Sequence, residues 1–117
     1  QDYDAAMSVG KTIKEAIRGR DAVVIASTDL SHYVSRETAK RKDGLALDAI
    51  KTMDPKRLYE VVRDNDISMC GYGPVIAMLT AARELGARRA DLIRYATSGD
   101  ASGDRSAVVG YAGIVIR

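Results

Sequence analysis

The sequence predicts an α/β domain, and three observations support this class. The apolar run 22–26 contains no polar residue, which is typical of a strand buried on both faces. Apolar residues recur at helical spacing both before and after this run. The end of the chain is rich in Val, Ile and Tyr, the residues that favour paired strands.

The first helix is predicted over residues 6–18, where apolar residues occupy one face and charged residues the other. Gly19 ends this helix, because glycine readily adopts the left-handed conformation found just after a helix. A two-residue link leads into the predicted strand 22–27. This order of helix and buried strand suggests a parallel sheet.

Three further helices are predicted in the middle of the chain. Ser35 can cap a helix that starts at the next residue. The pair Asp54-Pro55 supplies an N-cap and a first helical residue for a short helix. Residues 74–85 carry apolar side chains at 3.6-residue spacing, and Gly86 closes that helix.

A β-hairpin is predicted at the end of the chain. Its strands are residues 92–97 and 107–116, and a polar loop over residues 98–105 joins them. No internal repeat or composition shift divides the 117 residues, so we expect a single domain.

Composition argues against nucleic-acid and membrane partners. The 18 Lys and Arg residues are scattered among 16 Asp and Glu, whereas a nucleic-acid-binding face gathers basic residues. No apolar run approaches the roughly 20 residues of a membrane-spanning helix. The single cysteine allows no internal disulfide, which fits a reducing compartment. We therefore expect a cytoplasmic protein.

The most informative stretch is Asp29-Leu30-Ser31-His32-Tyr33, which holds the one histidine of the sequence. It follows the predicted strand, and chemistry in α/β sheets gathers beyond the carboxyl ends of strands. His32 is a candidate metal ligand or general base, with Asp29 as second ligand or orienting group. The alternative is a loop histidine that stabilises a turn.

Cys70 is the second candidate, because it lies between Met69 and Gly71 just ahead of a predicted helix. Free amide groups at a helix N-terminus stabilise a thiolate, which could act as ligand, nucleophile or redox group. The alternative is a small buried apolar residue.

Asp29, His32 and Cys70 together have the residue types of a catalytic triad or of part of a metal site. With one His and one Cys, this sequence cannot complete a site of soft ligands, so carboxylates or another segment must do so. Two donors on one ion must be close, so we expect a His32 ring nitrogen and Cys70 Sγ within about 4 Å.

Three blocks of this sequence, at residues 23–33, 67–74 and 92–100, resemble the C-terminal half of the Memo family. The blocks appear in the family's order and spacing, and the resemblance covers essentially all of residues 1–117. The family is similar to the LigB-like class III extradiol dioxygenases, which are non-haem iron enzymes. The resemblance implies part of an α/β domain with a mixed central β-sheet flanked by helices and a metal-binding cleft.

The resemblance also implies roles for three residues. His32 matches the histidine of the family's Asp-x-x-His block, Asp29 its aspartate, and Cys70 the cysteine of its Cys-Gly block. The implied metal ligands are His32, Cys70 and Asp29, and the implied catalytic residues are Asp29 and His32. The family's other histidines lie in its N-terminal half, in segments that this sequence does not contain. This difference, and a first residue that is not Met, lead us to expect that residues 1–117 are half of a Memo-like domain.

Three hypotheses for function follow. The first is a dioxygenase-like oxidoreductase that uses iron or copper when the N-terminal half is present. The cysteine replaces a carboxylate typical of the dioxygenases, so their reaction cannot be assumed. The second is a non-catalytic adaptor whose partners include AMMECR-type and radical-SAM proteins. The third is a packing role only, with self-association through an exposed sheet edge.

Overall fold

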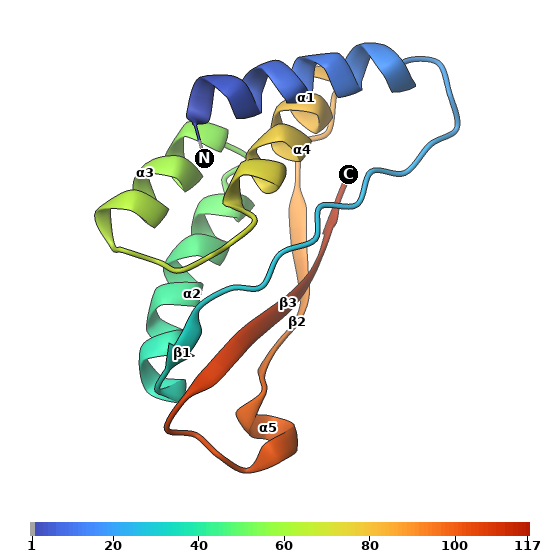
Figure 1. The fold of residues 1–117 in the computed structure, drawn as a ribbon. Coiled ribbons are helices and arrows are strands. Elements are labelled where there is room, and N and C mark those ends of the chain that lie inside the picture. The colour runs from blue at the N-terminus through green and yellow to red at the C-terminus, as the bar shows by residue number, and fades with distance from the viewer. Residues whose placement is uncertain (1) are drawn as a thin grey trace.

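The computed structural model describes residues 2–117 and confirms the α/β class (Figure 1). The helices are α1 (Tyr3–Ile17), α2 (Arg36–Lys51), α3 (Pro55–Asp64), α4 (Tyr72–Glu84) and the short α5 (Gly99–Ser102). The strands are β1 (His32–Val34), β2 (Ala90–Thr97) and β3 (Val108–Ile116). Within this described part of the chain, no helix is long and apolar enough to cross a lipid bilayer.

The strands form one sheet in the order β1-β3-β2, and both pairings are antiparallel. The predicted hairpin is confirmed: Ala90 pairs with Ile116 at one end and Thr97 with Gly110 at the other. The loop between the two strands contains α5, which the sequence did not indicate. The parallel pairing suggested by the helix-strand order is absent from residues 2–117.

The residues predicted to start α2 and α3 and to end α4 do so in the structure. The side chain of Ser35 accepts a hydrogen bond from the Thr38 amide at the start of α2. Asp54 accepts from the Lys56 amide at 3.0 Å and starts α3 in the same way. Gly86 follows α4 with a φ of +98°, which is the left-handed conformation expected after a helix.

Helices and sheet enclose one apolar core. α1 packs across α4, whereas α2 packs on β2, β3 and α3 (Figure 1). Leu58 of α3 and two residues of α4, Ile76 and Leu79, are completely buried. Met69, in the loop before α4, is 2% exposed and belongs to the same core. The loop that carries Cys70 is therefore anchored in the protein interior.

The prediction of a buried strand over residues 22–27 is wrong. These residues run in an extended path without forming a ladder, and Val23 and Ile25 are 87% and 84% exposed. Hydrogen bonds to β3 begin only at Leu30, whose amide donates to the Gly110 carbonyl, while the Gly110 amide donates to Ser31. A strand requires a neighbouring strand to pair with its amides and carbonyls, and none of the strands in residues 2–117 pairs with this segment.

Candidate metal centre

The structure brings the three candidate ligands together although Cys70 lies 41 residues beyond Asp29 in the sequence. One donor atom from each of Asp29, His32 and Cys70 lies within 4.8 Å of the other two. His32 Nε2 lies 3.6 Å from Asp29 Oδ2. The side chains of His32 and Asp29 are 24% and 49% exposed, so the cluster opens to solvent.

The ring of His32 is held in a defined orientation by Ser68. His32 Nδ1 lies 2.5 Å from the Ser68 carbonyl oxygen, which can only accept a hydrogen bond. Nδ1 therefore carries a proton, and in the neutral ring the lone pair is on Nε2, which faces Asp29. A histidine that binds a metal commonly donates its other N–H to a carbonyl in this way. The His32 amide also donates to Ser68 Oγ at 2.8 Å.

Alternating burial in residues 67–70 places Ser68 and Cys70 at the site. Ile67 and Met69 are 5% and 2% exposed and pack in the core. In an extended chain the intervening side chains point the opposite way, so Ser68 and Cys70 face outward. Sequence reasoning missed Ser68, although the apolar-polar alternation from 67 to 70 was a visible signal.

Thr28 joins the loop of Asp29 to the loop of Cys70. Its hydroxyl accepts a hydrogen bond from the Gly71 amide at 2.7 Å and donates to the Asp29 carbonyl at 2.7 Å. Cys70 Sγ lies 3.7 Å from Thr28 Oγ1. A Cβ at Gly71 would stand 2.5 Å from Thr28 Cβ, so the close approach of the two loops requires glycine.

A buried carboxylate lies under the His32 loop. Asp43 of α2 is fully buried, and its Oδ1 accepts the Ser31 amide at 2.9 Å. Its Oδ2 accepts the hydroxyl of Tyr95 at 2.7 Å. Burial and the hydrogen bond to Asp43 raise the pKa of Tyr95. Sequence reasoning missed Asp43, although it lies at helical spacing with the buried residues Ala39, Ala46, Leu47 and Ile50.

The donor set fits a transition-metal ion. Thiolate and imidazole suit zinc, copper and iron, and a carboxylate can complete a three-ligand site with an open position. Bonds of about 2.3 Å to sulfur and about 2.1 Å to nitrogen at a tetrahedral angle would place those two donors about 3.6 Å apart. The three donors here lie within 4.8 Å of one another, so side-chain rotations of up to about an ångström would be needed to close them on one ion.

The geometry does not support a Cys-His-Asp triad. In a triad, one imidazole nitrogen faces the nucleophile and the other faces the carboxylate. Here Nε2 faces Asp29, while Nδ1 is engaged by the carbonyl of Ser68. The nitrogen that a triad would direct at Cys70 therefore has another partner.

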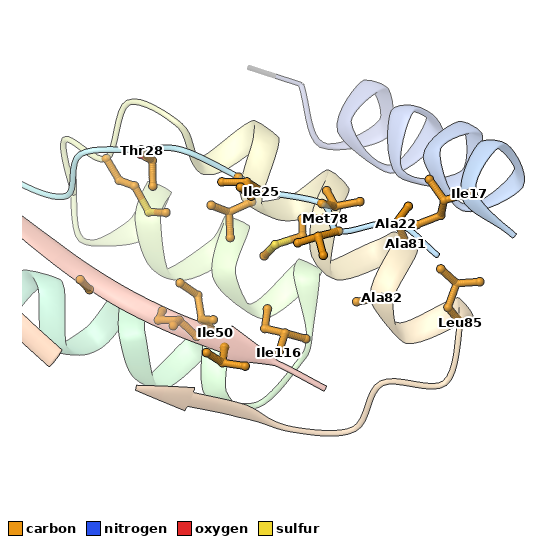
Figure 2. Close-up of a pocket in the computed structure, with 18 of the residues that line it drawn as sticks. Ile17, Ala22, Ile25, Thr28, Ile50, Met78, Ala81, Ala82, Leu85 and Ile116 are labelled. Atoms are coloured by element: carbon orange, nitrogen blue, oxygen red, sulfur yellow. The ribbon is translucent and has the colours of Figure 1, made fainter. Parts of the chain in front are cut away.

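An apolar cavity of about 530 Å³ adjoins the cluster. It lies between the extended segment 22–28, α4 and β3, and Thr28 and Met69 belong to its lining next to the candidate ligands. Figure 2 shows Thr28 at one end of the cavity and Leu85 at the other, with Met78 between them. Its volume lies in the range of roughly 300–1,000 Å³ that is common for small-molecule sites.

The fold and the cluster define an α/β protein with a candidate metal site, and comparison with known proteins is more specific. The Memo-like protein family matches residues 1–115. A MEMO1 family protein of Methanocaldococcus jannaschii is 52% identical over 99% of this chain and 41% of its own length. Another, from Methanothermobacter thermautotrophicus, is 51% identical over 96% of this chain and 41% of its own. The chain belongs to the Memo family, and it spans about two fifths of the length of these relatives.

Proposed function

We propose that this chain supplies part of the metal centre of a dioxygenase-like oxidoreductase. His32 Nε2 and Cys70 Sγ bind an iron or copper ion, and Asp29 is the third ligand. The proposal is carried by the convergence of the three donors together with the Nδ1 hydrogen bond that directs the Nε2 lone pair toward them. Thiolate and imidazole also suit zinc, but iron and copper are the proposed metals because an oxidoreductase needs an ion that changes its oxidation state, which zinc does not.

Two residues next to the cluster hold its side chains in place in this proposal. Ser68 fixes the tautomer and rotation of His32, while Thr28 keeps the Cys70 loop against the Asp29 loop. A bound ion would supply Lewis acidity and one-electron chemistry. The half-exposed carboxylate of Asp29 could move between the ion and a substrate proton, and so act as a general base.

Further ligands and the substrate are also part of the proposal. Additional histidines would come from a polypeptide segment outside residues 1–117, in keeping with the greater length of the relatives. The adjoining cavity is lined almost wholly by apolar side chains, which favours a small organic substrate with an apolar body.

The proposal is tested by the metal content of the purified full-length protein, including any segment outside residues 1–117, measured by inductively coupled plasma mass spectrometry. We expect iron or copper in the unmodified protein, and its loss from the His32→Ala and Cys70→Ala variants. Asp29→Asn should lower the metal content less, because an amide oxygen still binds metal, but weakly. Asp21→Asn, at an exposed position, is the matched control. Unchanged metal content in both the histidine and the cysteine variants would contradict the proposal.

A second candidate function is a non-catalytic adaptor, favoured by the exposed apolar side chains of Val23 and Ile25 beside the site. In that case AMMECR-type or radical-SAM proteins would bind this surface. A pull-down with purified proteins of both types, using the full chain and a Val23→Ser/Ile25→Ser variant, separates the candidates. The adaptor hypothesis requires binding that the double substitution abolishes.

A further inference from the structure

The buried carboxylate of Asp43 contacts none of the candidate ligands, yet it holds the backbone beside His32. The Ser31 amide donates to Asp43 Oδ1 at 2.9 Å, and Ser31 immediately precedes His32. The Ser31 carbonyl accepts the Gly110 amide at 3.0 Å. The next amide, that of His32, donates to Ser68 Oγ. Three successive backbone groups are thus fixed from α2, β3 and the loop before α4.

The surroundings of Asp43 are shaped to receive this side chain. A Cβ at Gly110 would overlap Asp43 Oδ2, so the glycine of β3 leaves room for the carboxylate. Tyr95, on β2, donates to the same oxygen, and its raised pKa keeps this hydroxyl protonated as a donor. Among the ion pairs of residues 2–117, none involves Asp43.

Burial of a carboxylate without a cation is costly, so an apolar residue would stabilise the core more simply. Asp43 is completely buried, so contact with solvent does not explain why a charged residue occupies this position of α2. What the carboxylate provides is two acceptor oxygens in fixed directions, one for the His32 loop and one for the sheet.

We propose that Asp43, supported by Tyr95, is a positioning residue that sets the placement of His32 for metal binding. This inference rests on the proposed metal centre. It assigns Asp43 a role through the backbone of Ser31 and not as a ligand. Loss of the carboxylate lets the 29–32 loop relax, and the Nε2 lone pair of His32 then points away from the ion more often.

The test is a titration of the full chain, freed of metal, with Co²⁺. Cobalt bound to a thiolate gives a charge-transfer band, and its ligand-field bands report coordination geometry. We expect Asp43→Ala to weaken Co²⁺ affinity by about tenfold or more, in the range typical for residues that support a ligand. Asp43→Asn retains an acceptor oxygen for the Ser31 amide and should recover part of the affinity. Tyr95→Phe should weaken affinity less than Asp43→Ala and shift the ligand-field bands in the same direction.

Matched controls are Asp48→Asn on the exposed side of α2 and Tyr111→Phe on β3, neither of which should change the titration. A purely structural role would lower the melting temperature without altering affinity or spectrum, and that result overturns the inference. If Asp43→Ala does not fold, Tyr95→Phe decides by the same criteria. Failure of the unmodified protein to bind Co²⁺ would instead overturn the proposed metal centre, and this inference with it.

Discussion

The imidazole of His32 has its two nitrogens in different surroundings, and this difference determines its chemistry. Nδ1 donates to a backbone carbonyl, so only Nε2 is available to a ligand or a proton. The sequence alone predicted that His32, Asp29 and Cys70 act together, from their positions and from the resemblance to the Memo family. It did not predict Ser68 or Asp43, because their contributions depend on contacts between segments 36 and 12 residues apart.

The buried hydroxyl of Tyr95 should make the stability of the protein depend on pH in the alkaline range. Its pKa is raised above 10.0 in the folded protein, mainly by burial and then by the Asp43 hydrogen bond. Below pH 10 both the folded and the unfolded protein keep the proton. Above pH 10 the unfolded chain loses it first, so the free energy of unfolding should fall as pH rises.

The measurement is urea unfolding between pH 9 and pH 11. Tyr95→Phe removes the titrating group, so its stability should decline less steeply with pH than that of the unmodified protein. Tyr33→Phe, at a side chain 81% exposed, is the control and should keep the original slope. Parallel curves for Tyr95→Phe and the unmodified protein would contradict the burial of this hydroxyl beside Asp43.

Helices and the hairpin were predictable because their signals are local. Capping side chains, proline at a first helical position and the glycine after α4 act within a few residues. The segment 22–27 was predicted wrongly because a strand depends on partners elsewhere in the chain. Its apolar composition is compatible with a strand, but no strand within residues 2–117 pairs with it.

Two glycines, one between loops and one inside α2, should respond in opposite ways to substitution by alanine. Gly71→Ala would force a Cβ against Thr28 and the Ser27 carbonyl, where the loops of Asp29 and Cys70 meet. We expect a loss of about 1–3 kcal/mol in the free energy of unfolding, typical of overpacking. Gly44→Ala, inside α2 with nothing within 4 Å of the new Cβ, should stabilise the protein by about 0.5–1 kcal/mol.

Chemical denaturation of both glycine variants provides the measurement, and each serves as the control for the other. Opposite signs are expected, because one alanine meets the neighbouring loop and the other only favours a helix. A Gly71→Ala variant as stable as Gly44→Ala would mean that the two loops are not in close contact.

At the scale of the whole molecule, the candidate site lies at the margin of the packed core. The loop of Cys70 is anchored by Met69, whereas the segment leading to Asp29 exposes Val23 and Ile25. Along this segment runs the apolar cavity, with Thr28 at one end (Figure 2), and Thr28 directly precedes Asp29 in the sequence. The longer relatives in the Memo family have further polypeptide with which such a site could be enclosed and completed.

In the proposed centre, His32 and Cys70 bind one metal ion. X-ray absorption spectroscopy of the metal-loaded full chain tests it most directly, because sulfur and nitrogen ligands give separate shells. We expect one sulfur at about 2.3 Å together with nitrogen or oxygen ligands at about 2.0–2.2 Å, and loss of the sulfur shell in Cys70→Ser. A first shell of nitrogen and oxygen alone in the unmodified protein would contradict it.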